Sequence, residues 1–136
     1  MVLSKVAAIE IGSNAVRLLI SRVQKQADGS ELKRLLHLRI PLRLGEDSFT
    51  LGEISEKRIK KLTKMMIAFR HVMNVYEVDI FRAYATSAVR YAKNNEEIVR
   101  IMKEKAKIDL KVLTGAQEAK ISLESHSREI LQLKNN

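Results

Sequence analysis

The chain has 136 residues, of which 46% are hydrophobic, and this is the length of one ordinary domain with a single core. It carries 25 Lys and Arg against 16 Asp and Glu, so its net charge of +9 should attract polyanions of any kind. The absence of cysteine excludes disulfides and thiolate metal sites, and the three histidines lie far apart in sequence. Any metal ion would therefore need oxygen ligands.

Three further observations narrow the class of protein. No apolar run approaches the roughly 18 residues that a membrane span requires, and the N-terminal residues lack the apolar stretch of a signal peptide. We therefore expect a cytoplasmic protein with no membrane partner. Three Phe, three Tyr and no Trp are too few for the aromatic platforms typical of single-strand nucleic-acid binders.

The first third of the chain predicts three antiparallel strands. Residues 6–11 are apolar and rich in β-branched side chains, and they end at a Gly-Ser-Asn turn that leads into a second strand at 15–23. Apolar and polar residues alternate again from 36 to 42 and predict a third strand. Pro41 donates no backbone hydrogen bond, so this strand should end at a sheet edge or a bulge.

The middle of the chain predicts a loop, a long helix and a strand. Two glycines flank the acidic pair Glu46-Asp47, so residues 44–51 are expected to form a loop. Ser55 is a plausible N-cap for a helix whose apolar side chains recur every three or four residues. The stripe consists of Ile59, Leu62, Met66, Phe69 and Met73. A buried strand is predicted at 78–86.

The last third predicts a helix, a strand and a final helix. Asn94 and Glu97 have the spacing of a capping box, which would open a helix ending near residues 105–107. Alternation at 108–112 predicts the last strand, and residues from 116 onward read as helical. The elements of this single domain therefore follow the order β-β-β-α-β-α-β-α, which is an α/β fold.

Three turns follow predicted strands, at residues 12–14, 86–90 and 114–118. If the later strands are parallel to the first, these turns converge at the carboxyl edge of the sheet. Gly12 lets the backbone approach an anion closely, and the amides of Ser13 and Asn14 can then form a concavity for phosphate. Gly-Ser-Asn is also ordinary turn chemistry, so this motif alone does not identify a site.

Three charged residues near these turns are candidates for chemistry. Arg90 could fork onto phosphate oxygens, although a lone arginine is more often a surface residue. Glu118 lies in the first turn of the last helix, where it could serve as a general base for water or merely as an acid at a helix start. Glu10 lies within an apolar strand and needs a partner, which a magnesium ion beside phosphate would supply.

Four segments together resemble one known family. Residues 9–20 (IEIGSNAVRLLI), 43–46 (RLGE), 85–94 (ATSAVRYAKN) and 114–119 (TGAQEA) are similar, in order and spacing, to the first lobe of the Ppx/GppA exopolyphosphatase and guanosine pentaphosphate phosphohydrolase family. The resemblance covers about residues 6–123. Four ordered motifs are far more specific than any one of them.

The resemblance implies a fold and a site. The fold would be an actin-like ATPase (ribonuclease H-like) lobe with a mixed five-stranded sheet, one of two lobes that close over a phosphate chain. Gly12, Ser13 and Asn14 match the first phosphate-binding loop, Arg90 matches the phosphate-binding arginine, and Glu118 matches the proposed catalytic glutamate. The implied cofactor is Mg²⁺, with the carboxylate before the loop holding it through water.

Two residues depart from the family pattern. Glu10 stands where the family usually has Asp, and Gln117 replaces the first Glu of a Glu-Glu pair. The second lobe is also missing, so the chain should act as an N-terminal lobe, an excised domain or the product of a truncated gene, with little activity alone. A homodimer is left open.

The sequence therefore predicts one lobe of a hydrolase for phosphoanhydride bonds in inorganic polyphosphate or guanosine pentaphosphate. The Glu10 and Gln117 departures keep a second hypothesis open, a non-catalytic domain that binds polyphosphate or an alarmone nucleotide. A small basic nucleic-acid-binding domain is the third, and only the charge favours it.

Overall fold

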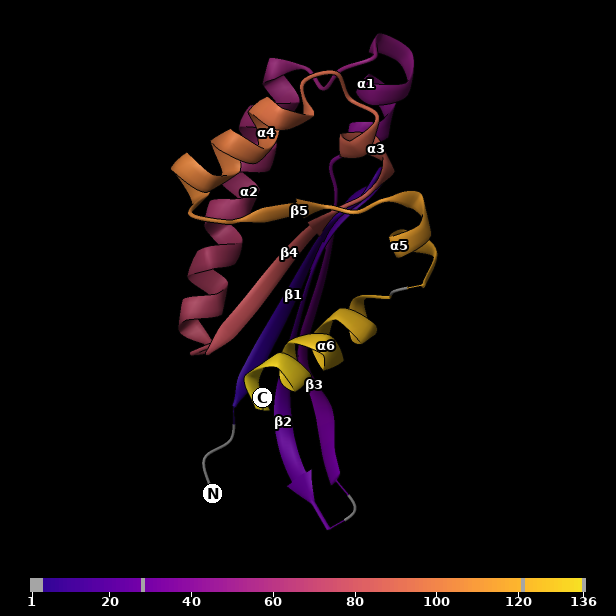
Figure 1. Cartoon of the computed structure of the whole chain (residues 1–136). Coiled ribbons are helices and arrows are strands. Elements are labelled where there is room, and N and C mark those ends of the chain that lie inside the picture. Colours follow the sequence, from indigo (N-terminus) through magenta and orange to yellow (C-terminus); the bar gives the residue numbers. More distant parts are fainter. Residues whose placement is uncertain (1–3, 28, 121, 136) are drawn as a thin grey trace.

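The computed structural model describes residues 4–27, 29–120 and 122–135, and it contains a five-stranded sheet with helices on both faces (Figure 1). The strands lie in the order β3-β2-β1-β4-β5. Their bounds are β1 Lys5–Ile11, β2 Ala15–Gln26, β3 Gly29–Pro41, β4 Ile80–Ala85 and β5 Leu110–Val112. The β1, β2 and β3 strands are antiparallel, whereas β4 is parallel to both β1 and β5, so the predicted mixed sheet is confirmed.

The helical elements are α1 Leu44–Leu51, α2 Glu56–Val75, α3 Ser87–Arg90, α4 Asn95–Ile101, a π-helical turn at Met102–Ala106, α5 Gly115–Lys120 and α6 Leu123–Asn135. The predicted β-β-β-α-β-α-β-α order is confirmed in outline. The structure adds the short helices α1 and α3 and divides the last helix into α5 and α6. None of the helices in the described ranges is both long enough and apolar enough to cross a membrane.

The main core lies between one face of the sheet and the helices α2 and α4. Side chains of Ala7, Ile9 and Ile11 alternate toward this face and are fully buried. The predicted apolar stripe of α2 packs against them, and all five of its members are buried. Ser55 caps α2 as predicted, because its side chain accepts the N–H of Arg58 at 3.3 Å.

Helix α6 crosses the opposite face of the sheet (Figure 1). Val6 and Ala8 alternate toward that face and pack with Leu123 and Ile130 in a second, smaller core. His126 is buried here and stacks on Tyr84 with ring centroids 3.6 Å apart. Burial lowers the pKa of His126, so the folded protein holds the ring neutral.

The prediction of a loop at residues 44–51 is wrong, because this segment forms α1. The helix begins after Arg43, which has a left-handed backbone (φ 55°), and ends at Gly52 (φ 78°). Leu44 is fully buried, and α1 packs beside α3. Gly45 lies in the first turn of α1 and glycine weakens helix formation in isolation, so tertiary contacts decide this segment.

Asp47 ties α1 to the start of α2. Its carboxylate accepts the N–H of Ser55 at 2.9 Å and lies 3.4 Å from Nε of Arg58. Burial acts to raise the pKa of Asp47, but the hydrogen bonds from Ser55 and the charge of Arg58 outweigh it, so the pKa is lowered.

The predicted capping box at Asn94 and Glu97 is also wrong. The Asn94 side chain makes no cap hydrogen bond. It pairs instead with the backbone of Ile54, accepting its N–H at 3.1 Å and donating to its carbonyl at 2.8 Å. Asn94 therefore joins the start of α4 to the segment between α1 and α2.

A reciprocal capping arrangement occurs at α5 instead. The Gln117 amide oxygen accepts the N–H of Thr114 at 3.0 Å, and the Thr114 hydroxyl accepts the N–H of Gln117 at 3.1 Å. Gln serves this role as well as Glu. The departure at Gln117 is thus compatible with a well-formed start of α5.

Candidate active site

The site begins with the turn between β1 and β2. The N–H of Gly12 donates to the carbonyl of Ala15 at 3.0 Å and closes the turn. A Cβ at Gly12 would lie 3.1 Å from that same carbonyl oxygen, closer than most real Cβ contacts. The turn therefore favours glycine, as predicted for a loop that brings its backbone close to a ligand.

The segment leading into α1 anchors the carbonyls of this turn. The carbonyl of Ser13 accepts the N–H of Gly45 at 2.9 Å, and that of Asn14 accepts the N–H groups of Leu42 and Arg43 at 3.2 and 3.0 Å. Among the described residues, no acceptor takes the N–H of Ser13 or Asn14. Two amide donors are thus available to an anion.

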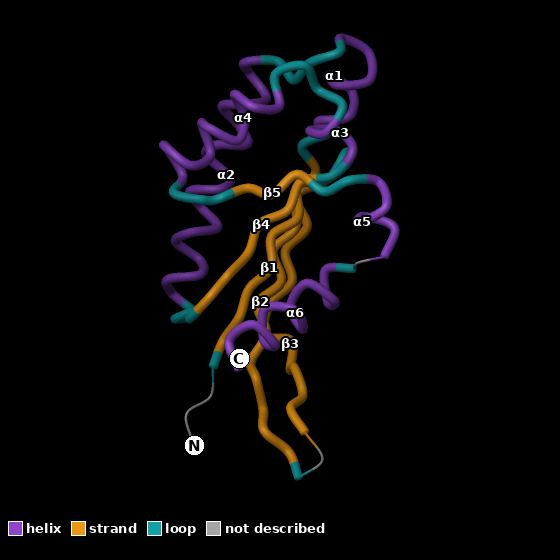
Figure 2. Tube along the Cα trace, viewed as in Figure 1, coloured by secondary structure: helices purple, strands orange, loops and turns teal. Residues whose placement is uncertain are grey.

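The turn after β4 lies beside this loop because β1 and β4 are parallel and end together. The N–H of Thr86 donates to the carbonyl of Ile11 at 3.1 Å, and the hydroxyls of Ser13 and Ser87 lie 2.9 Å apart. Figure 2 shows the loops after β1, β4 and β5 gathered at one end of the sheet. The predicted convergence of three turns is therefore observed.

Arg90, at the end of α3, reaches the turn after β5. One guanidinium nitrogen donates to the carbonyl of Leu113 at 2.7 Å, and the other lies 3.0 Å from the carboxylate of Glu118. Burial acts to lower the pKa of Arg90, but the hydrogen bond to Glu118 outweighs it and the pKa is raised. Arg90 is therefore a fixed cation that orients the Glu118 carboxylate.

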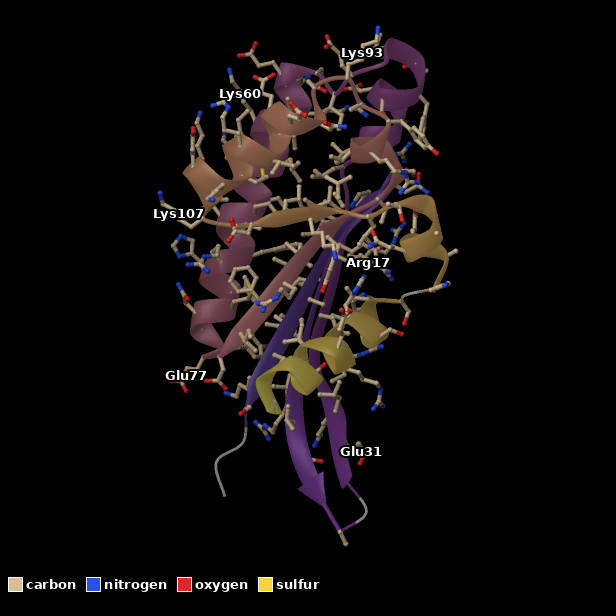
Figure 3. All side chains as sticks on the ribbon, in the orientation of Figure 1. Arg17, Glu31, Lys60, Glu77, Lys93 and Lys107 are labelled. Carbon is tan, nitrogen blue, oxygen red and sulfur yellow. The ribbon has the colours of Figure 1, made fainter. Side chains whose placement is uncertain are left out.

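Glu10 lies at the end of β1, directly opposite Arg17 in β2. Its carboxylate is 3.3 Å from the Arg17 guanidinium, and both side chains are partly buried. Arginine is thus the partner that the sequence required for this acid. Figure 3 shows Arg17 on the side of the sheet that carries α6.

A polar hollow of about 300 Å³ joins these groups. Five of the six predicted site residues line it, and Arg90 contacts it through Glu118. The lining consists of Glu10, Gly12, Ser13, Asn14, Ala15, Arg17, Arg39, Thr86, Ser87 and Glu118. Sequence reasoning did not assign Arg17 and Arg39 to the site, although their alternation with buried neighbours places them on the face of Glu10.

A larger hollow of about 670 Å³ lies between α2 and α4, away from the strand ends. Its lining mixes acidic residues such as Glu56 and Glu104 with basic ones such as Lys60 and Arg100. Lys60 lies 3.5 Å from Glu56, and Arg100 lies 3.3 Å from Glu104. These charges largely compensate one another, so the smaller hollow is the better candidate for an anionic ligand.

The residues that line the hollow could supply at most two carboxylates to a magnesium ion. Within the described ranges, no group of three or more His, Asp or Glu side chains could hold a metal ion. Mg²⁺ is commonly bound through one or two carboxylates together with waters and substrate phosphates. Glu10 and Glu118 provide two carboxylates in the lining, which fits that mode of binding.

Comparison with known proteins gives this arrangement a context. The Ppx/GppA phosphatase family matches residues 19–132, which is most of the chain. The chain belongs to this family.

Individual curated relatives are similar to most of the chain. A bifunctional 3-dehydroquinate synthase/phosphatase of Fusobacterium nucleatum is 28% identical over 119 residues, covering 85% of this chain and 18% of its own length. Exopolyphosphatase 2 of Mycobacterium tuberculosis is 28% identical over 127 residues, covering 90% of this chain and 40% of its own length. The chain therefore spans well under half the length of these relatives.

Solved structures agree with the predicted fold class. The crystal structure of the Aquifex aeolicus Ppx/GppA family member superposes with a TM-score of 0.79 at 31% identity, covering 86% of this chain and 37% of that one. The fold is thus the actin-like ATPase type of lobe found in Ppx/GppA proteins, as the resemblance implied.

Proposed function

We propose that this chain forms the first lobe of a hydrolase that cleaves terminal phosphoanhydride bonds in inorganic polyphosphate or guanosine pentaphosphate. The observation that carries the proposal is the position of the two available amides of Ser13 and Asn14 in the same hollow as Glu118. Relatives named exopolyphosphatase support the substrate class. A second lobe would supply the remaining phosphate contacts.

Each group in the hollow has a role in this proposal. The amides of Ser13 and Asn14 bind oxygens of the terminal phosphate, which fixes its position and offsets its charge. Arg90 donates a guanidinium N–H to an oxygen of the same phosphate, and this new hydrogen bond weakens the ion pair between Arg90 and Glu118. The Glu118 carboxylate then accepts a proton from a water molecule.

The reaction is a simple displacement. The water oxygen bonds to the terminal phosphorus as the bond to the bridging oxygen breaks, releasing inorganic phosphate and a chain shorter by one unit. Glu118 holds the proton taken from water and can return it to the departing oxygen. A bound Mg²⁺ would neutralise charge on the phosphates, with Glu10 holding it through water.

One observation favours the second hypothesis, a domain that binds polyphosphate or an alarmone without cleaving it. Arg90 holds the Glu118 carboxylate in an ion pair at 3.0 Å, as it would in a binding domain whose Glu118 takes no part in chemistry. The two functions differ in whether the phosphate displaces this ion pair. Turnover therefore separates them, whereas binding does not.

The test uses a two-lobed protein in which this chain is joined to the second lobe of a family member. Replacement Arg90→Ala should raise KM and lower kcat for phosphate release, because Arg90 contacts the phosphate both before and in the transition state. Lys93→Ala, which removes the same charge from an exposed neighbouring position, should change neither constant. Unchanged constants in Arg90→Ala would refute the proposed site.

The isolated 136-residue chain should release almost no phosphate, because one lobe provides only part of the phosphate contacts and leaves the hollow open to water. Phosphate release at rates comparable to a full-length family member would contradict the one-lobe proposal.

A further inference from the structure

Two exposed aromatic rings lie in contact near the hollow. Phe49 of α1 and Tyr91, the residue after α3, have ring centroids 6.5 Å apart at an interplanar angle of 53°. They are 56% and 64% exposed. Figure 1 shows α1 beside α3 at the end of the sheet where the loops after β1 and β4 gather. Single apolar side chains on a surface are ordinary, but a pair of exposed rings beside a candidate site indicates a ligand.

The backbone places this aromatic pair close to the loop at residues 12–14. The carbonyl of Ser13 accepts the N–H of Gly45 at 2.9 Å, and its hydroxyl lies 2.9 Å from that of Ser87. Phe49 follows Gly45 by four residues in α1. Tyr91 likewise follows Ser87 by four residues. Each ring therefore belongs to a residue about one helical turn, or about 5.4 Å, beyond a residue that touches Ser13.

The ring of Phe49 lies back toward the loop. A Cβ built on Gly45 would be 3.1 Å from Cε2 of Phe49 and also 3.1 Å from Cβ of Ser13. The ring and the loop thus flank the same point beside Gly45. A ligand bound by the amides of the loop would have the ring within reach.

Arg90 holds the ring of Tyr91 in place. Cζ of Arg90 lies 4.9 Å from the centroid of this ring, a cation–π contact. The guanidinium is itself held by the carbonyl of Leu113 and the carboxylate of Glu118. Because Arg90 covers one face of the ring, the exposed surface of Tyr91 includes the other face. A ring that is fixed before a ligand arrives loses little freedom on binding.

We propose that Phe49 and Tyr91 form a stacking site for the base of a nucleoside polyphosphate whose terminal phosphate occupies the hollow. This inference rests on the proposed function and adds to it a subsite that inorganic polyphosphate would not use. Stacking on aromatic rings tolerates every base, so the site selects nucleotides as a class.

The size of the aromatic pair favours one base over a larger partner. Proteins that bind single strands stack successive bases along a groove, whereas the exposed aromatic side chains in the described ranges are these two. A stable protein interface needs roughly 800 Å² per partner, and two aromatic side chains provide at most about 500 Å². The pair therefore fits the base of a single nucleotide.

Two residues of α1 provide a matched pair of variants. Phe49 and Leu51 are both exposed, and two positions along a helix separate their side chains by about 200° around its axis. Phe49→Leu removes the ring but keeps an apolar side chain, whereas Leu51→Ala removes exposed apolar surface on another side of the helix. Equal thermal midpoints for the two variants would establish that both are folded.

Calorimetric titration of the 136-residue chain, at one moderate salt concentration, compares guanosine triphosphate with tripolyphosphate. Phe49→Leu should weaken the binding of guanosine triphosphate about fivefold to 100-fold relative to Leu51→Ala, the range for loss of a ring that stacks one base. Tripolyphosphate should bind both variants equally, because it reaches only the hollow.

Fluorescence gives a second measurement that reports stacking itself. The chain contains no Trp, so Phe49→Trp introduces a single indole into the aromatic pair. Guanosine triphosphate should quench this indole because the base stacks on it, whereas tripolyphosphate should leave its emission unchanged. Leu51→Trp is the control, and neither ligand should quench it.

Three outcomes would overturn the stacking site: equal affinities of Phe49→Leu and Leu51→Ala for guanosine triphosphate, an equal loss of tripolyphosphate affinity in Phe49→Leu, or single-stranded RNA binding that depends on Phe49 more strongly than nucleotide binding does. Failure of the proposed function has a different signature. If Arg90→Ala leaves tripolyphosphate affinity unchanged, the hollow is not the phosphate site, whatever the result for Phe49.

Discussion

Asn94 is predicted to be one of the most important polar side chains for stability. Its amide accepts the N–H of Ile54 and donates to the carbonyl of Ile54, and Ile54 is 1% exposed. Asn94→Ala would leave both backbone groups without a partner at a buried position. Each such group costs about 1–3 kcal/mol, so for the two groups together we expect a loss of about 2–6 kcal/mol. This is a large share of the roughly 5–15 kcal/mol that stabilises an ordinary domain.

Urea unfolding followed by circular dichroism measures this loss directly. Asn94→Asp keeps the acceptor and removes the donor, so its loss should be intermediate. Glu97→Ala is the control, because a capping box would require Glu97 whereas the structure leaves it exposed. Its cost should stay below about 0.5 kcal/mol, as for ordinary surface substitutions. If Asn94→Ala costs no more than Glu97→Ala, the pairing with Ile54 does not stabilise the protein.

Two further predictions concern the loop and α6. In Gly45→Ala, the new Cβ would lie 3.1 Å from Cβ of Ser13, so the affinity for tripolyphosphate should fall several-fold in a titration. The control is Gly115→Ala, whose new Cβ would have no atom within 4 Å and which should bind tripolyphosphate normally. Equal affinities of the two variants would contradict the loop geometry. The lowered pKa of His126 means that the unfolded chain binds more protons below about pH 6.5, so stability should fall with decreasing pH by up to about 1.4 kcal/mol per unit. His126→Phe keeps the stack on Tyr84 and should flatten the dependence of the unfolding free energy on pH, measured by urea unfolding between pH 7.5 and 5. An unchanged dependence would mean that other groups cause the loss of stability at low pH.

Local periodicity was sufficient to predict the hairpin and α2, because the burial of each side chain follows from its position along a single element. Helix α1 was missed since its stability comes from contacts with α3 and from the bond between Asp47 and Ser55. The error at Asn94 has the same origin. Its partner, Ile54, is 40 residues away, and short-range spacing favoured a cap.

Some features of the candidate site could likewise be predicted from the sequence, and others depend on tertiary contacts. The glycine turn and the residues after each strand were predicted, because parallel strands end at one edge. The pairing of Arg90 with Glu118 was not, since it depends on how the turn after β5 approaches α3. Arg39 was missed because a charged residue in an alternating strand usually faces solvent, and only the register with Arg17 places it in the hollow.

The turnover of Glu118→Gln in the two-lobed protein tests the central claim most directly. Gln keeps the shape and can still accept a hydrogen bond from Arg90, but it cannot take a proton from water. Phosphate release from polyphosphate should fall about 100- to 10,000-fold, the usual range for loss of a general base, while affinity for the chain stays similar or tightens. Glu96→Gln, at an exposed position in α4, should release phosphate at the normal rate. A folded Glu118→Gln protein with near-normal turnover would contradict the hydrolytic account and leave a polyphosphate-binding or alarmone-binding domain.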